Sequence, residues 1–537
     1  MGVVFRIAKK DFLNNLLTAR FVIGFVLCLV LIPFSVLINV DDYREQISLY
    51  RVDLAAAEKS QKEIRVYSAL RPEIVFPPEP LSVLGKGLSG QVGNKLRIRL
   101  GEVPLLAEGK TAARDNPFLA SFFSVDFVDI AAVIFSLLAL LFSYDALTRE
   151  KEDGTLRLQM AGDLPRSKLL AGKIAGIWLT LLPVLVFCFG LGAVIVLASG
   201  DLAFSGREWA RLALLAVISL VYLAVFVLIG LFVSSRSTGS VTSLVLCLLL
   251  WVLLVFVAPN LSSYLAESFV AVPSRDNLNA VLADLDRAFE KRVEEATSSL
   301  GRPDWQMDWY SNSADDGYRE SYGCTASYFE YKRRAASISE PLRIDNADRK
   351  WGPQKAYLDS LTRQARAADW LSMLSPAGIF RLVGTALCGT DWRAQDRRLE
   401  DLRRYRETFV RYLQGKGIFS SFAYITAAPP STFKTADQLV AARSGGAFKT
   451  LAEYDAWAAR QTDFRAQWQV LYKVAVPGER PGDYPYLAID DLPRYADRPG
   501  LLFAGIEVSV IRLGFLIFEA IFLFALGYVA FLRYDVR

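Results

Sequence analysis

Six long apolar runs constrain the fold of this chain more than any other feature of its sequence. They are Phe21–Val40, Val128–Tyr144, Ile174–Ser199, Leu212–Ser235, Val241–Val257 and Leu513–Leu532. A bilayer core about 30 Å thick needs roughly 20 helical residues to cross it, and most of the runs reach that length without a charge. They are apolar on every side, whereas core helices of soluble proteins usually carry a single apolar stripe. We therefore predict an all-α polytopic membrane protein with six transmembrane helices.

The first apolar run has an alternative interpretation as a cleaved signal peptide, because basic residues precede it. Its apolar stretch is longer than the core of a signal peptide, and no cleavage site of small residues follows it. We therefore favour a membrane-spanning helix here as well.

The lysines and arginines beside the apolar runs indicate how the chain crosses the membrane. With six spans, those of the termini and short connections fall on one side: Arg6, Lys9, Lys10, Arg20, Arg149, Lys151, Arg157, Arg166, Lys168, Arg236, Arg533 and Arg537. Such residues accumulate on the cytoplasmic side. We predict a multi-pass protein of the cell inner membrane, with both termini cytoplasmic and two extracytoplasmic insertions.

The predicted divisions of the chain follow from this topology. Residues 1–20 have apolar positions at helical spacing opposite basic ones, which is typical of an amphipathic helix in the membrane interface. We expect transmembrane helices at 21–40, 128–147, 173–199, 209–235, 238–258 and 505–532. Residues 148–172 form a cytoplasmic loop and 533–537 a cytoplasmic tail. Residues 41–127 and 259–500 are extracytoplasmic, and the larger region is mainly α-helical because its apolar residues recur near every 3.6 positions.

Composition removes several classes of function. The chain contains no histidine, the commonest general base and metal ligand, and its cysteines lack zinc-site spacing. The stretch nearest to an ATP-binding loop, "GEVPLLAEGKT" at Gly101–Thr111, has its first glycine three positions too early. A net charge of +5 is small for this length and does not indicate nucleic-acid binding. We predict no catalytic residues, no metal site and no cofactor bound by this chain.

The cysteines divide between the apolar runs and the large insertion. Cys28, Cys188 and Cys247 lie within apolar runs, while Cys324 and Cys388 lie in the large extracytoplasmic region. An oxidising compartment permits a disulfide between Cys324 and Cys388, which closes a long loop. Two buried free thiols are the alternative.

Charged residues in or beside spans are costly in a bilayer and are functional candidates. Glu519 lies fourteen residues before Arg533, near mid-bilayer at about 1.5 Å per residue, and suits a packing or dimer contact or a substrate path. Glu507 and Arg512 lie near the outer boundary of the same span, where they are expected to be solvated or paired with each other. Asp126 and Asp129 share one face at the outer end of the second span.

The segment Ser143–Gly176 is dense in both charge signs although apolar runs flank it. Its opening "DALTREKEDG" continues the second span until Gly154, "TLRLQMAG" can form about two turns, and Pro165 begins a new helix. A rigid inward protrusion of this kind can receive force from a soluble partner. A solvated loop between spans is the alternative.

This segment resembles the inner loop of type-2 ATP-binding-cassette (ABC) export permeases, roughly E-K-E-x-G-T-L followed by P-x-x-R-x-x-x-x-x-G-K. The leader "IAKKDFLNNLLTARF", the closing "RYDVR", "PPEPLSVLGKGL" and "LSPAGIFRLVGTALCGTD" are also similar to the branch with a large outer domain of unknown function before the last span. The last of these stretches is too broken by proline and glycine to span, so we expect it to pack as core or to lie on the outer leaflet.

The resemblance implies a permease subunit of an ABC exporter that works with a separate ATPase subunit, which holds the ATP and Mg²⁺. It implies a homodimer, or a heterodimer with a similar permease, and an ATPase contact at Glu150, Lys151, Glu152, Gly154, Thr155 and Leu156, with Pro165, Arg166 and Lys173 as a second arm. Membrane lipid and a periplasmic partner of the outer region are further expected contacts. Two alternatives stay open: an ABC-powered assembly or mechanical device that moves no solute, and a membrane receptor without an ATPase.

Overall fold

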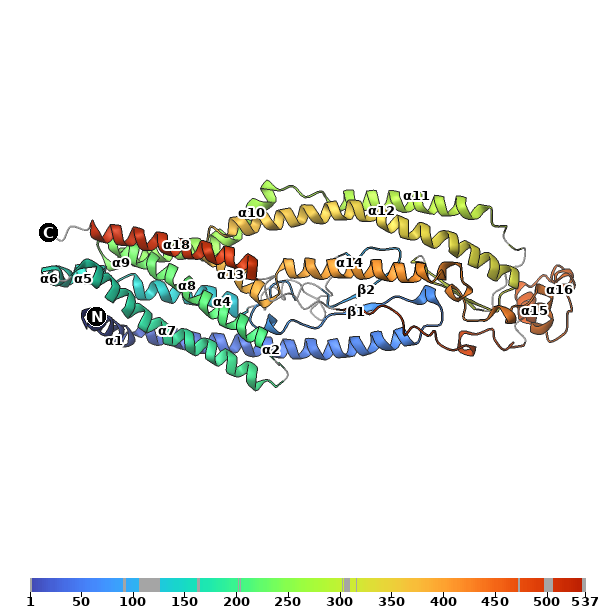
Figure 1. The fold of residues 1–537 in the computed structure, drawn as a ribbon, viewed down its shortest axis with the longest axis horizontal. Coiled ribbons are helices and arrows are strands. Elements are labelled where there is room, and N and C mark those ends of the chain that lie inside the picture. Colours follow the sequence, from blue (N-terminus) through green and yellow to red (C-terminus); the bar gives the residue numbers. More distant parts are fainter. Residues whose placement is uncertain are drawn as a thin grey trace.

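The computed structural model describes residues 2–89, 93–105, 126–161, 165–200, 202, 204–301, 303, 310–314, 316–471, 474–496 and 506–533. The molecule is elongated, with a helical bundle at one end and a long helical region at the other (Figure 1). We call the end of the bundle that carries both termini, α5 and α6 the proximal end. The opposite end is the distal end, and the region that extends from it is the distal region.

Six helices of the described chain are long and apolar enough to cross a membrane. They are built on α2 (Ala19–Lys62), α4 (Phe127–Ser143), α7 (Arg166–Ala198), α8 (Gly206–Arg236), α9 (Ser240–Val252) and α18 (Ile506–Leu532). A separate amphipathic helix, α1 (Gly2–Leu16), precedes them. The predicted all-α polytopic membrane architecture is confirmed.

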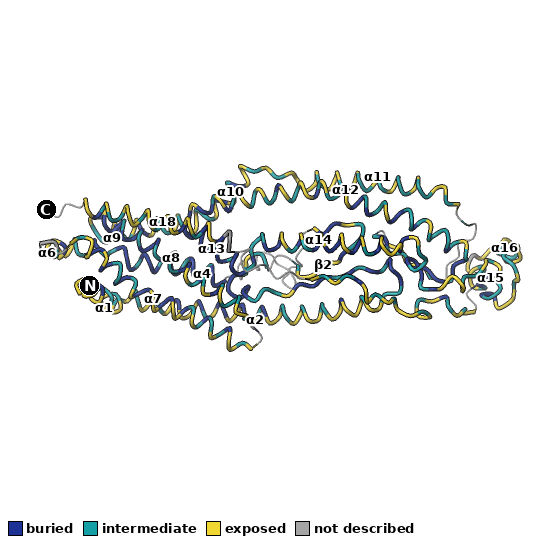
Figure 2. The backbone as a smooth tube through the Cα atoms, in the orientation of Figure 1, coloured by how far each residue is buried: buried dark blue, intermediate teal, exposed yellow. Residues whose placement is uncertain are grey.

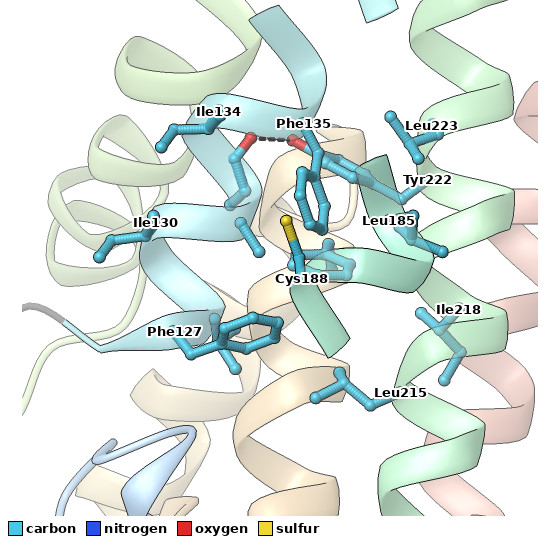
Figure 3. Packing of buried hydrophobic residues seen from close by; sticks show 14 of the residues in the cluster. Phe127, Ile130, Ile134, Phe135, Leu185, Cys188, Leu215, Ile218, Tyr222 and Leu223 are labelled. Carbon is cyan, nitrogen blue, oxygen red and sulfur yellow. Dashed lines mark hydrogen bonds between the residues drawn. The ribbon is translucent and has the colours of Figure 1, made fainter. Parts of the chain in front are cut away.

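Helix α4 occupies the centre of the bundle. Within the candidate spans, 78% of its apolar window is buried, against 11% for α18, which therefore lies at the periphery. Figure 3 shows Phe135 and Cys188 packed beside Tyr222. The hydroxyl of Tyr222 donates a hydrogen bond of 2.6 Å to the carbonyl of Ala132 in α4. This bond satisfies a phenol that is otherwise fully buried among apolar side chains.

The bundle core also contains α13 (Pro376–Cys388), a helix that is too short to span. Its Phe380 ring stacks on Tyr222 of α8, with the ring centroids 4.5 Å apart. A Cβ on Gly384 would lie 2.6 Å from Val128 of α4, so this glycine permits a close approach of the two helices. The broken apolar stretch therefore packs as core rather than lying on the surface.

The structure does not join Cys324 and Cys388 in the disulfide that the sequence permits. Both thiols are buried, and they belong to different apolar cores. Cys388 ends α13 inside the bundle core, whereas Cys324 lies in the core of the distal region with Phe329. The structure supports the alternative, in which the two buried thiols are not bonded to each other.

The distal region is a set of long helices around a second apolar core. Its helices are the outer half of α2, α10 (Ala258–Phe269), α11 (Arg275–Ser298), α12 (Ala326–Ser372), α14 (Trp392–Gly415), α15 (Ala436–Arg443), α16 (Leu451–Ala458) and α17 (Phe464–Leu471). Two antiparallel two-stranded sheets accompany them: β1 (Glu73–Val75) pairs with β2 (Lys95–Arg97), and β3 (Tyr310–Ser313) with β4 (Arg319–Tyr322). Figure 2 shows that α11 carries no buried residue, so it lies outside this core.

A π-helical segment, Leu253–Val257, joins α9 to α10. Such wide turns leave backbone carbonyls available to other partners. Here the hydroxyl of Ser375 donates to the carbonyl of Leu254, and the guanidinium of Arg381 donates to that of Val255 at 3.4 Å. Both donors lie at or within α13, so α13 is bonded directly to the middle of this span.

Candidate functional site

The charged segment that follows α4 forms two short helices at the proximal end of the bundle (Figure 1). They are α5 (Thr148–Glu152) and α6 (Thr155–Ala161), and residue 154 between them has a φ of +69°. Glycine suits this left-handed backbone, which reverses the chain after α5. The side chain of Leu156 anchors α6 in a small apolar cluster with Leu147, Leu169 and Phe531. The pair of helices is therefore fixed to the bundle.

Lys151 and Glu152 bond to the facing ends of two spans. The ammonium of Lys151 donates to the carbonyls of Ser234, Ser235 and Ser237, at 3.0, 2.7 and 3.0 Å, where α8 ends. The Glu152 carboxylate accepts from the backbone N–H of Ser240 at 2.7 Å and from its hydroxyl at 2.6 Å, where α9 begins. A cation at a helix C-terminus and an anion at a helix N-terminus both oppose the helix dipole charges, so each contact stabilises.

Glu150 takes part in a buried charge cluster with α1 and α7. Its carboxylate accepts from the Lys173 ammonium at 2.5 Å, and the same ammonium lies 3.2 Å from the carboxylate of Asp11. Lys173 is only 5% exposed. Burial raises the pKa of Asp11, and the neighbouring Lys173 opposes that effect. One cation therefore joins α1, α5 and α7 at a place where water has little access.

Helix α1 can lie against α7 because α7 has two glycines on the contact face. A Cβ on Gly172 would lie 2.7 Å from Ile7, and a Cβ on Gly176 would lie 2.8 Å from Asp11. Glycine pairs four residues apart are a common device for close helix approach in membranes. The contact brings Asp11 to Lys173.

We predict that Gly176→Ala destabilises the protein although alanine favours helices. The new methyl group must displace Asp11 and the carbonyl of Ala8, 3.2 Å away, and such overpacking typically costs 1–3 kcal/mol, against a helix propensity gain of about 0.5–1 kcal/mol. Thermal unfolding of the purified chain measures the net loss, roughly 1 kcal/mol. Gly190→Ala, where nothing lies within 4 Å of a new Cβ on the same helix, is the control and should be neutral or stabilising.

Arg166 bonds the second arm of the segment to the last span. Its guanidinium donates to the carbonyls of Phe531 and Leu532, at 3.2 and 2.6 Å, where α18 ends. Pro165 precedes this arginine and occupies the N-cap position of α7. The ends of α8, α9 and α18 are thus all bonded to one segment. A partner that moves this segment would move the ends of these spans with it.

The exposed residues of the α5–α6 segment, which a soluble partner could contact, differ in part from those that the sequence motif suggested. Glu150, Lys151, Lys173 and Leu156 are turned inward, whereas Asp153, Gly154, Thr155, Arg157 and Leu158 are exposed. Leu158 is 77% exposed and lies on the opposite side of α6 from the buried Leu156. The motif did not identify Arg157 and Leu158. An apolar residue two positions from a buried one in a helix is the signal that could have revealed them.

The charged residues at the distal end of the bundle form a second network. Asp126 caps α4 and accepts from the backbone N–H groups of Asp129 and Lys86, both at 2.8 Å. Burial and the neighbouring Asp129 carboxylate raise the pKa of Asp126 to about 6. Asp129 pairs with Arg381 of α13 at 3.0 Å. This network fastens α13 to the start of α4.

Arg512 pairs with a residue of the distal region. Its guanidinium donates to the carboxylate of Asp369, the last turn of α12, and to the carbonyl of Leu382 in α13, both at 2.9 Å. The side chain of Glu507 lies outside the described part of the chain. Glu519 is partly buried, and one of its carboxylate oxygens has no hydrogen-bond partner among the described residues.

Two sequence families match the chain. A model of the family described as ABC-2 family transporter protein matches residues 5–307, which is more than half of the 537 residues. A model described as a domain of unknown function (DUF3526) matches residues 345–434, which include α13 and α14. No curated protein matches the sequence.

Proposed function

The chain belongs to the ABC-2 transporter family, and from this premise we propose that it is the permease subunit of an exporter driven by a separate ATPase subunit. The ATPase binds the proximal end of the bundle from the cytoplasm and supplies the energy of ATP hydrolysis. The permease lies in the inner membrane as a dimer, and substrate leaves toward the distal region. Family membership supports the transmembrane permease role and the partnership with an ABC ATPase.

One short segment carries this proposal, because it combines an exposed contact face with charge-assisted hydrogen bonds to the ends of two spans. The contact face consists of Asp153, Gly154, Thr155, Arg157 and Leu158. Behind it, Lys151 and Glu152 bond to the adjoining ends of α8 and α9. A displacement of the contact face therefore reaches both spans through charge-assisted hydrogen bonds, which are about twice as strong as neutral ones.

Charge supports the cytoplasmic orientation of the proximal end. Its short segments carry the basic residues Arg6, Lys9, Lys10, Arg149, Arg157, Lys168 and Arg236, and lysines and arginines of short loops favour the cytoplasmic side. The distal region translocates as a long insertion, which this rule does not govern.

We predict that Leu158→Asp weakens ATPase binding by about 30-fold or more, because loss of a well-packed interface anchor typically costs at least about 2 kcal/mol. The tagged full chain is purified from its native membranes, and the bound ATPase is identified by mass spectrometry and then titrated against the purified permease. Leu17→Asp is the matched control, since Leu17 is an equally exposed leucine of the same end but outside the contact face.

Two results would contradict the proposal. Recovery of no ATPase with the wild-type chain would favour a receptor without an ATPase. Equal affinity of the ATPase for wild type and Leu158→Asp would show that the ATPase does not dock on α6. Vesicle export assays with the intact complex then separate a transporter from an assembly device.

A further inference from the structure

A groove lies between α7 and α18 in the proximal half of the bundle. Its proximal part has a volume of about 420 Å³, a size typical of ligand sites, and is lined by Ser167, Leu170, Ala171, Ile174, Ala175, Trp178, Phe524 and Tyr528. A second part of about 300 Å³ shares Ile174, Trp178 and Phe524 with the first and has its floor on α8. The two parts therefore form one continuous apolar channel along the span.

The groove exists because α18 packs mainly on α8 and makes far fewer contacts with α7. The α7 wall combines small residues at helical spacing, Ser167, Ala171 and Ala175, with the larger Leu170, Ile174 and Trp178. The α18 wall carries Phe524 and Tyr528. No lining residue of either part is acidic.

The proximal mouth of the groove is basic. Lys168 lies three and seven positions before Ala171 and Ala175, so it shares the face of α7 that lines the groove. It is exposed and forms no ion pair with any described residue. Arg533 is exposed where α18 ends, and that end is held beside the start of α7 by the Arg166 bonds to Phe531 and Leu532.

We propose that this groove is a binding site for an anionic phospholipid of the proximal leaflet. One acyl chain lies along the apolar channel against Trp178, and the phosphate lies at the mouth beside Lys168 and Arg533. The apolar walls match the acyl chain of such a lipid, and the exposed ammonium of Lys168 matches its phosphate. Basic pockets between spans on the cytoplasmic side are the recurrent geometry for binding acidic headgroups.

Trp178 allows a direct test because it lines both parts of the groove. The full chain is placed in nanodiscs of phosphatidylcholine that contain a minor fraction of lipid with brominated acyl chains, which quench tryptophan on contact. Brominated phosphatidylglycerol is compared with brominated phosphatidylcholine. The chain has ten tryptophans. Subtracting the fluorescence of Trp178→Phe from that of the wild type leaves the fluorescence of Trp178 alone.

We expect brominated phosphatidylglycerol to occupy the site beside Trp178 in preference to brominated phosphatidylcholine at equal content in the bilayer. Each cation at the mouth should contribute about a fivefold factor to this preference. Lys168→Glu should abolish the preference, whereas Lys9→Glu, the same charge change on an exposed residue of α1, should retain it. Ala171→Met narrows the groove without changing charge and should reduce quenching by both lipids. If Lys168→Glu fails to fold, Ala171→Met still tests whether lipid occupies the groove.

Two outcomes overturn the proposal. Equal quenching of wild-type Trp178 by the two brominated lipids means that the groove holds bulk lipid only. Absence of quenching by either lipid, together with a disulfide between copies of Ser167→Cys, assigns the groove to a second copy of the chain. Neither outcome depends on the ATPase, so the test is independent of the proposed docking surface.

Discussion

Replacement of Lys173 by methionine is expected to destabilise the proximal end of the bundle by about 3–5 kcal/mol, the cost typical of removing one member of a buried charge cluster. The variant leaves the carboxylates of Glu150 and Asp11 without the cation between them, at 2.5 and 3.2 Å in the wild type. Thermal unfolding of the full chain, with hydrogen exchange of α1 and α5, measures the loss.

The control for this prediction is Lys9→Met, because Lys9 is exposed on α1 and its removal should change stability by less than about 0.5 kcal/mol.

The loss of stability in Lys173→Met should also depend on pH. Without the cation, the pKa of Asp11 rises further above the value of about 4 for an unfolded chain, so the folded state binds the extra proton. Stability of the variant relative to wild type should therefore recover as the pH falls toward about 5. A deficit independent of pH would show that the loss is one of packing.

Glu479→Ala is expected to destabilise the far end of the distal region, which contains α15 and α16, by about 3–5 kcal/mol (Figure 1). We call this end the tip. The Glu479 carboxylate lies 3.1 Å from the guanidinium of Arg443, and the side chains are 3% and 0% exposed. Arg443 also donates to the carbonyl of Gly323 at 2.6 Å, so the arginine joins α15 to the start of α12. Truncation of the glutamate removes the carboxylate that opposes the charge of this buried guanidinium, which is costly. Hydrogen exchange of residues 436–484 in the full chain reports the local loss of protection.

Two variants calibrate this result. Asp284→Ala breaks the pair of Asp284 with Arg287, whose side chains are 68% and 76% exposed, and should cost less than about 1 kcal/mol. The double variant Arg443→Met and Glu479→Met removes both charges from the tip and should recover most of the stability, because apolar residues of similar volume often replace a buried pair without loss. Equal effects of Glu479→Ala and Asp284→Ala would contradict the expected cost of breaking the buried pair.

The features predicted best from the sequence are those set by long local patterns. Six apolar runs of spanning length became six candidate spans, and the resemblance of the inner loop to ABC permeases is confirmed by the family match. The helical character of the larger insertion, which α11 illustrates, follows in the same way from apolar residues that recur near every 3.6 positions. Each of these predictions depends only on neighbouring residues.

The features that the sequence could not predict depend on partners far away in the chain. Nothing local to Lys151 indicates that its ammonium reaches the carbonyls of Ser234 and Ser235, some 83 and 84 positions later. The motif residues therefore looked like an outward contact, although most of them bond to the bundle. The disulfide failed for the same reason, because compartment and residue type do not say which core each cysteine enters.

The π-helical turn between α9 and α10 adds a transverse joint to a structure that otherwise runs along one axis. Its Leu254 and Val255 carbonyls are held by Ser375 and Arg381, so a shift of α9 along its length must break these bonds or carry α13 with it. Because α13 follows directly on the long α12, such a shift would be carried by α13 to the base of α12 and so into the distal region. Two side chains thus couple the middle of one span mechanically to the far part of the molecule.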